Sequence, residues 1–302
     1  MRTIRLYLVG VLAIGVCACD RSTDPAHGAA ASETADVATG TVDGLRDTIA
    51  DNVERIDGAD VAMVIDHGRL AKEAGVTMPA SVVTVFNAPA VTAPLMQADP
   101  RIGLDLPIKV LAYGETHDRG PMVAFVTPEF VATRHAVADR SLLEGYKRIV
   151  DQSLAGIPED QLSPTIEVAE GYGLIEWASE YSFAETVTRL KEVVLAQGDT
   201  VWFGEIDYQR DAAVLGVDIG PAILLLFGGP GPGGKAMAEF PKLGLDAFCQ
   251  KLLVYETPDG RANVAFNDIV AFAELHYGDS NEFQQVINKR LKQTFSGAIK
   301  NP

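Results

Sequence analysis

The sequence predicts an α+β protein built from two tandem copies of one domain. Residues 65–106 align with residues 206–247 at a constant offset of 141 with no gap, and 13 of these 42 positions are identical. An internal repeat of this kind defines the organisation of a chain before any other pattern is interpreted. Each copy alternates apolar runs with turn residues, and consecutive strands joined by short turns favour an antiparallel sheet with helices on one face.

The second repeat, residues 173–280, shows the predicted order most clearly. Ser182 and Glu185 form a capping pair that starts a helix, which is expected to end near Gly198. Asn267 or Asp268 caps a closing helix over residues 269–277. Strands are expected at residues 173–179, 200–206, 223–227, 251–256 and 262–266.

The first repeat, residues 41–137, follows the same order but lacks a convincing first strand, for which only residues 35–38 are available. Thr41 is expected to cap a helix over residues 42–53, and Pro128 fits the first turn of the closing helix. The constant offset pairs Leu106-Pro107 with Ala247-Phe248. Strands are expected at residues 61–65, 82–86, 108–113 and 122–126.

Two segments lie outside the repeats. Residues 138–172 are interpreted as a helical linker, because apolar residues at helical spacing precede Gly156, Pro158, Ser163 and Pro164. Residues 281–302 form a C-terminal tail or helix.

The amino terminus predicts export and lipid anchoring. Residues 1–18 combine a basic start with an apolar run too short to span a bilayer, as in a signal peptide. The sequence around Cys19 resembles a bacterial lipobox, which implies that Cys19 carries the lipid. Residues 19–40 then form the anchor and a flexible tether. The protein is expected on the periplasmic side of a membrane, and Asp20 favours the inner membrane.

Composition limits the partners and the redox chemistry. The formal net charge is −16, and cleavage of the signal removes two further positive charges, Arg2 and Arg5. Such an acidic chain disfavours binding to nucleic acid and to anionic lipid surfaces. Only Cys249 remains besides the lipid-bearing Cys19, so no intrachain disulfide is expected. The strand-like surroundings of Cys249 predict a buried small hydrophobe.

A set of short motifs carries a family resemblance. The motifs are Ile65-Asp66-His67, Phe86-Asn87-Ala88-Pro89, Pro94 to Pro100, Leu104-Asp105-Leu106-Pro107 and Arg134-His135. They resemble the bacterial family called domain of unknown function 302, over residues 41–137 and 173–277. The resemblance implies a β-α-β(4)-α fold like half of the TATA-binding protein, often paired as a dimer, and it implies no activity or functional residue. The two copies are therefore expected to pair as an intrachain pseudo-dimer.

Histidine and methionine residues form the first candidate site. The first repeat offers His67, Met96 and His135, and the matched positions of the second repeat hold Tyr208, Met237 and His276. Thioether and imidazole groups suit copper, or haem iron as axial ligands. Methionine also fills gaps in cores, and a histidine at a helix end can bind free carbonyls. The cofactor is therefore left unspecified, with copper and haem as the metal alternatives.

Recurrent aspartates form the second candidate site. Asp66 and Asp207 match each other, and so do Asp105 and Asp246. Paired carboxylates can act in acid–base chemistry or hold a cation. The alternative is that each accepts hydrogen bonds from amides of a neighbouring turn.

The sequence of residues 229–236 is close to a phosphate-binding loop motif, but these residues are not expected to bind nucleotide. Ala236 replaces the hydroxyl residue needed for magnesium, and Pro230 and Pro232 lack the amides that would hold phosphate. A flexible loop is the better interpretation.

Three classes of function stay open. The leading hypothesis is a periplasmic lipoprotein that binds a small ligand or a metal in its two-domain body. The alternative is an interaction or structural protein that docks an envelope partner. An enzyme has least support, because no Gly-x-Ser-x-Gly nucleophile motif occurs and Cys249 has no evident base.

Overall fold

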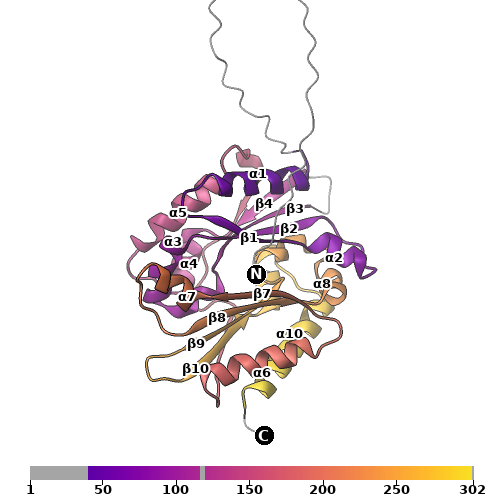
Figure 1. Ribbon diagram of the computed structural model, residues 1–302. Helices are drawn as coiled ribbons and strands as arrows, with labels where there is room; N and C mark the ends of the chain where they lie inside the picture. Colours follow the sequence, from indigo (N-terminus) through magenta and orange to yellow (C-terminus); the bar gives the residue numbers. More distant parts are fainter. Residues whose placement is uncertain (1–39, 116–119, 301–302) are drawn as a thin grey trace, which may run out of the picture. The chain divides into compact units, whose positions relative to one another are not determined.

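Two five-stranded sheets form the body of the protein in its computed structural model, which describes residues 40–115 and 120–300 (Figure 1). These residues belong to one compact unit, Asp36–Pro302. One sheet has the strand order β1-β2-β3-β4-β5 and the other the order β6-β10-β9-β8-β7. The predicted α+β class with two tandem domains is confirmed. The signal peptide, the lipidation of Cys19 and nearly all of the tether were predicted within residues 1–39, which lie outside the described residues.

The first half of the chain contains the elements up to β5. Its strands are β1 (Asp60–Asp66), β2 (Ser81–Asn87), β3 (Ile108–Gly114), β4 (Pro121–Phe125) and β5 (Leu162–Pro164). Its helices are α1 (Val42–Glu54), α2 (His67–Glu73), α3 (Pro89–Ala98), α4 (Pro128–Arg134) and α5 (Leu142–Ser153). Two 3-10 turns are η1 (Pro100–Leu104) and η2 (Glu159–Gln161).

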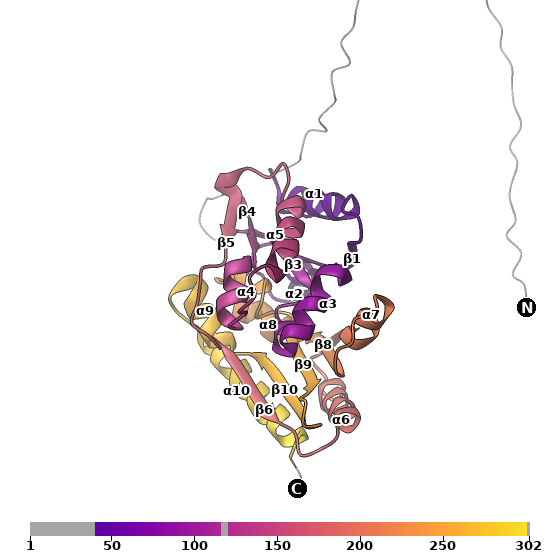
Figure 2. The same cartoon turned by 90° about the vertical axis from the view of Figure 1, so that its left-hand side faces the viewer.

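The second half repeats this order. Its strands are β6 (Leu174–Ala178), β7 (Val201–Asp207), β8 (Ala222–Gly228), β9 (Gln250–Glu256) and β10 (Ala262–Asn267). Its helices are α6 (Phe183–Leu195), α7 (Tyr208–Val214), α8 (Pro230–Met237), α9 (Ile269–Tyr277) and α10 (Glu282–Ala298), with the 3-10 turn η3 (Pro241–Gly244). Helices α6 and α10 lie side by side (Figures 1 and 2). Helix α10 follows α9 as α5 follows α4 in the first half.

Local capping signals place the long helices as predicted. The Thr41 hydroxyl accepts the Gly44 amide at the start of α1, and the Ser182 hydroxyl accepts the Glu185 amide at the start of α6. A capped helix still needs a buried face to be stable. Helix α1 supplies one by burying Leu45, Ile49 and Val53 completely against its sheet.

The two sheets differ at one edge. In the second sheet, β6 pairs antiparallel with β10. In the first sheet, the corresponding edge is occupied by β5, which comes from the predicted linker and pairs parallel with β4. The residues suggested for a first strand, 35–38, lie outside the described part of the chain.

The register of the sheets shows that the offset of 141 does not hold throughout. Phe86 on β2 pairs with Ile108, whereas its match Phe227 on β8 pairs with Gln250. The second repeat thus has one extra residue before β9. The expected match of Leu106-Pro107 with Ala247-Phe248 is wrong. The correct match is Phe248-Cys249, and both pairs are joined by a cis peptide bond.

The predicted flexible loop at residues 229–236 is also wrong, because these residues form most of helix α8. Pro230 lies in the first turn, where its missing amide costs no hydrogen bond. Helix α8 packs directly on α2 of the first repeat. A Cβ atom at Gly234 would lie 2.7 Å from the Ala71 Cβ, so glycine permits this close approach. The glycines therefore serve packing between the repeats.

The contacts between the two repeats are reciprocal. Helix α2 packs on α8, and the matching helix α7 packs on α3. Turn η1 lies against β8, β9 and β10, while η3 lies against β2 and β3. Each repeat therefore inserts its 3-10 turn against the sheet of the other, in the way that subunits meet across a twofold axis.

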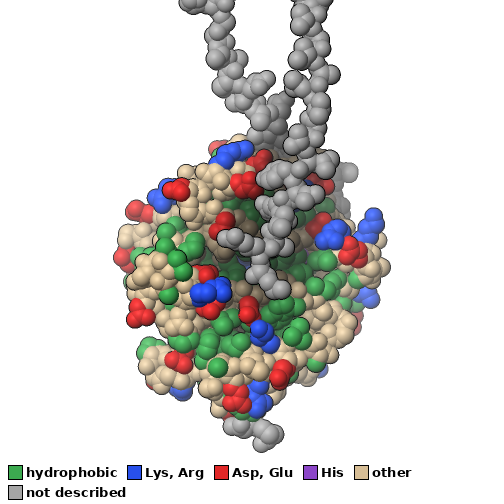
Figure 3. Space-filling view, in the orientation of Figure 1, with side chains coloured by type: hydrophobic (Ala, Val, Ile, Leu, Met, Phe, Trp, Pro, Cys, Tyr) green, Lys and Arg blue, Asp and Glu red, His purple; other side chains and the backbone are tan. Residues whose placement is uncertain are grey.

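One face of the protein is rich in apolar side chains. Hydrophobic side chains gather on the face that carries the edge strands β1 and β7, where Val64 and Val201 are 45% and 40% exposed (Figure 3). Among the described residues, none of the helices has the length and apolar character needed to cross a membrane.

Candidate functional site

Asp66 and Asp207 act as helix caps. Each ends the strand before a short helix, and its carboxylate accepts the backbone amide of Arg69 or Arg210, at 2.8 and 3.0 Å. This is the amide-accepting role that was the alternative to a catalytic or cation-binding one. By capping α2 and α7, these aspartates fix the backbone position of the first residue of each helix, His67 or Tyr208.

His67 and Tyr208 make the same contact across the repeat interface. The Tyr208 hydroxyl donates to the Gly103 carbonyl oxygen at 2.8 Å. His67 lies against the matching Gly244, whose position would bring a Cβ atom to 2.9 Å from the imidazole Cδ2. The Tyr208 hydroxyl is thus hydrogen-bonded, whereas the His67 imidazole interacts with the Gly244 backbone but its buried Nε2 forms no hydrogen bond of standard geometry. An unpaired buried polar atom of this kind requires an explanation.

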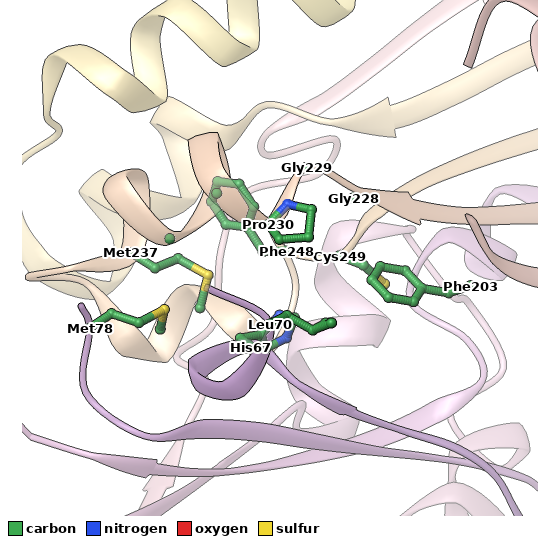
Figure 4. Close-up of a pocket in the computed structure, with 12 residues that line it drawn as sticks. His67, Leu70, Met78, Phe203, Gly228, Gly229, Pro230, Met237, Phe248 and Cys249 are labelled. Carbon is green, nitrogen blue, oxygen red and sulfur yellow. The ribbon is translucent and has the colours of Figure 1, made fainter. Parts of the chain in front are cut away.

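A cavity of about 30 Å³ lies beside His67 (Figure 4). The matching cavity beside Tyr208 measures about 10 Å³. One water molecule needs roughly 10–15 Å³ measured in this way. The larger cavity is lined by His67, Leu70, Met78, Phe203, Gly228, Gly229, Pro230, Gly233, Gly234, Met237, Phe248 and Cys249.

Substitutions between the repeats explain the difference in volume. Gly228, Gly229, Gly233 and Gly234 border the larger cavity. The residues at the matching positions have side chains, namely Asn87, Ala88, Thr92 and Ala93. The side chains that glycine removes and the exchange of tyrosine for histidine leave the His67 cavity more open.

Burial keeps the polar groups of this cavity neutral. It lowers the pKa of His67 to about 4, against the opposing effect of a hydrogen bond with the Gly244 backbone. Burial also raises the pKa of the Cys249 thiol to about 11. The side chain of Cys249 is 7% exposed, as predicted for a buried small hydrophobe.

A second polar cluster, the central cluster, lies at the core of the repeat interface. His135 Nε2 is 2.6 Å from Asp105 Oδ2, and His276 Nε2 is 2.9 Å from Asp246 Oδ2 at the matching positions. All four side chains are 2% exposed or less. The histidines at the ends of α4 and α9 therefore bind carboxylates, not the free carbonyls of their helices.

Arg134 joins the central cluster to both repeats. Its Nη1 donates to both oxygens of Asp105 at 2.8 Å, and its Nη2 donates to the Asn267 Oδ1 at 2.7 Å. Its Nε donates to the Tyr172 carbonyl oxygen at 2.9 Å. Burial opposes ionisation of Asp105, but Arg134 and His135 hold its pKa well below the usual range. Comparison of the repeats missed Arg134 as a site residue because Leu275 occupies the matching position.

Two buried lysines complete the central cluster. Lys109 and Lys251 occupy the same register position in their sheets, and their side-chain amines interact with each other. The Lys109 Nζ donates to the Asp105 carbonyl oxygen at 2.6 Å. Burial and the neighbouring Lys251 lower the pKa of Lys109 well below its usual value, and burial also lowers that of Lys251. The one-residue change of offset hid this pair from the sequence comparison.

The predicted histidine–methionine set is divided among three places. His67 and Met237 line the larger cavity, and Met96 lines the smaller one. His135 and His276 belong to the central cluster. Within the described residues, no group of three or more His, Cys, Asp or Glu side chains is placed to hold a metal ion.

Arg134 and Lys251 are expected to differ in their effect on stability. Arg134→Met should lower the free energy of unfolding by about 3–5 kcal/mol, because buried Asp105 loses its bidentate partner. Lys251→Met should be neutral or stabilising, because it removes the burial cost of the Lys251 Nζ and its repulsion with Lys109. Urea unfolding at pH 7 measures the free energy of unfolding of each variant and of the wild type. Equal losses in the two variants would contradict this assignment.

His67 should make the folded state sensitive to acid. Its folded pKa of about 4 lies below the unfolded value of 6.5, so the unfolded state binds more protons between these values. Stability is therefore lost as the pH falls from 6.5 to 4, by about 3 kcal/mol. The measurement is the change in unfolding free energy between pH 7 and pH 4, in the wild type and His67→Phe. The change should be about 3 kcal/mol smaller in His67→Phe, while Tyr208→Phe should retain the wild-type change. Equal changes in wild type and His67→Phe would refute the assignment.

Comparisons with known proteins address the family. The family model described as "Domain of unknown function DUF302" matches residues 34–153 and 175–301. Two curated relatives are named Fluoride-specific ion channel FluC 1, from Brucella suis biovar 1 (strain 1330) and Brucella abortus biovar 1 (strain 9-941). Each is 34% identical over 98 residues, which are 30% of this chain and 38% and 36% of those proteins. The chain thus spans under two-fifths of the length of these relatives.

A solved structure also matches. It is the crystal structure of an uncharacterized conserved DUF302 protein from Bacillus stearothermophilus, with 16% identity and a TM-score of 0.35. The match covers 42% of this chain and 95% of that chain. Since the family model matches two regions that together cover most of the sequence, the chain belongs to the DUF302 family, a family of unknown function, as a tandem protein with two copies of the domain.

Proposed function

We propose that the protein is a lipid-anchored periplasmic binding module that holds a small ligand in the His67 cavity. The supporting observation is the difference between two matched cavities. Tyr208 closes its cavity by bonding to Gly103, whereas His67 leaves a larger space and an unpaired Nε2. A duplicated interface that serves packing alone gives no reason to keep one cavity open.

The residues around the cavity fit a ligand-binding role. The lining is mostly apolar, with a histidine and a cysteine as the groups that can form directed bonds. Small-ligand sites have this composition, because the apolar wall excludes water and a few polar groups fix the ligand. The lining also comes from both repeats, so binding would depend on their assembly.

The size of the cavity limits the ligand. A volume of about 30 Å³ accommodates an ion or a very small molecule. A macrocycle such as haem does not fit it. Of the two metal alternatives, a single metal ion is therefore favoured over haem.

The channel activity named for the Brucella relatives is not part of this proposal. The chain spans only 38% and 36% of the length of those proteins.

The ligand should depend on His67 and not on Tyr208. Native mass spectrometry of the full chain, purified in detergent without chelator, should show a bound mass in the wild type. His67→Tyr should abolish that mass, because the tyrosine side chain occupies the cavity as Tyr208 does in its match. Tyr208→Phe should keep the mass and cost about 1 kcal/mol of stability for the lost hydrogen bond. A mass retained in His67→Tyr, or none in the wild type, would refute the proposal.

Replacing Cys19 tests the proposed lipid anchor. Cys19→Ala should move the protein from the membrane fraction to the periplasmic fluid and abolish labelling by palmitate, since the acyl chains provide the membrane affinity. Cys17→Ala is the matched control and should stay membrane-bound and labelled. The anchor assignment fails if Cys19→Ala remains in the membrane fraction with its label.

A further inference from the structure

Four potential metal donors line the His67 cavity. Met237 comes from the last turn of α8 and Met78 from the segment between α2 and β2. His67 begins α2, and Cys249 immediately precedes β9. Both repeats therefore contribute donors to one small space.

The matching positions of the other repeat have lost most of these donors. Tyr208 stands for His67, Ile219 for Met78 and Pro107 for Cys249, and only Met96 matches Met237. Core packing explains a single buried methionine in each repeat. It does not explain why histidine, cysteine and a second methionine are added on the same side of the interface.

The chemistry of these donors is soft. Two thioethers and a thiol accompany one imidazole, and the lining contains no carboxylate. Sulfur ligands select Cu(I), whereas Mg²⁺ and Ca²⁺ need oxygen ligands.

We propose that the ligand of the His67 cavity is a cuprous ion, held by His67, Met78 and Met237 with Cys249 beside them. This inference rests on the proposed binding function and specifies its ligand. In Figure 4, the side chains of Met78 and Met237 lie on one side of His67 and Cys249 lies on the other. The unpaired His67 Nε2 and the volume of about 30 Å³ fit one ion. A thiol at Cys249 becomes a stronger ligand once a cation lowers its pKa.

The test measures Cu(I) affinity of the full chain in detergent, without oxygen, by competition with a chromophoric Cu(I) chelator. The wild type should bind one Cu(I), and Met78→Leu and Met237→Leu should each weaken binding at least tenfold. Met96→Leu is the matched control, because it makes the same change at the equivalent position in the other cavity, and its affinity should be unchanged. X-ray absorption of the copper should show sulfur ligands. Leucine conserves the volume of methionine well enough for the variants to fold. Thermal unfolding of each variant checks that it is folded.

Several outcomes would overturn the cuprous assignment. One is equal affinity in the wild type and the Met237→Leu and Met78→Leu variants, and another is a copper spectrum without sulfur ligands. Zn²⁺ bound as tightly as Cu(I) would also overturn it. A His67-dependent bound mass other than copper would keep the binding function and refute the cuprous ion. If no bound mass depends on His67, both proposals fail.

Discussion

The buried ion pair of Arg134 and Asp105 is the constraint on which the arrangement of the two repeats depends. Both side chains are fully excluded from solvent, so each requires a partner, and leaving a buried charge unpaired costs several kcal/mol. The Arg134 guanidinium divides its donors between Asp105 of the first repeat, the Tyr172 carbonyl and Asn267 of the second. Phe130 and Phe272 lie within 6 Å of its charged carbon and exclude water from it. One side chain thus fixes the two repeats in a single relative position, and the reciprocal contacts of the 3-10 turns follow from that position.

The charges of the central cluster also constrain one another. Two carboxylates, Asp105 and Asp246, face Arg134, Lys109 and Lys251. These three basic side chains outnumber the two carboxylates, which favours an uncharged amine at one of the two lysines. The lowered pKa of both lysines agrees with this, and their mutual repulsion adds to the effect of burial on Lys109. The overall acidity of the chain is therefore not reflected in this cluster, where basic side chains outnumber carboxylates.

The sequence predicted what depends on local signals and missed what depends on register and on contacts between the repeats. Helices α1 and α6 were predicted because Thr41 and Ser182 cap them within a few residues. Strand β5 escaped prediction because three residues carry no periodicity. Helix α8 was mistaken for a loop because its glycines serve packing on α2, which only the assembled structure reveals. In the site, matched positions identified Asp105, Asp246, His135 and His276, but Arg134 has no match and the Lys109–Lys251 pair lies beyond the point where the offset changes.

Three departures from symmetry between the repeats meet at the His67 cavity. His67 stands at the start of α2, where the second repeat has Tyr208. On the other side of the interface, Gly228, Gly229, Gly233 and Gly234 leave little side-chain volume next to the cavity. The extra residue of the second repeat lies in residues 246–250, the segment that ends with Phe248 and Cys249 at the cavity wall. These three changes affect separate segments of the chain, so no single alteration of packing accounts for them together. The same segment begins with Asp246, whose partner is His276 in the central cluster. The central cluster thus contains one end of the segment whose other end lines the cavity.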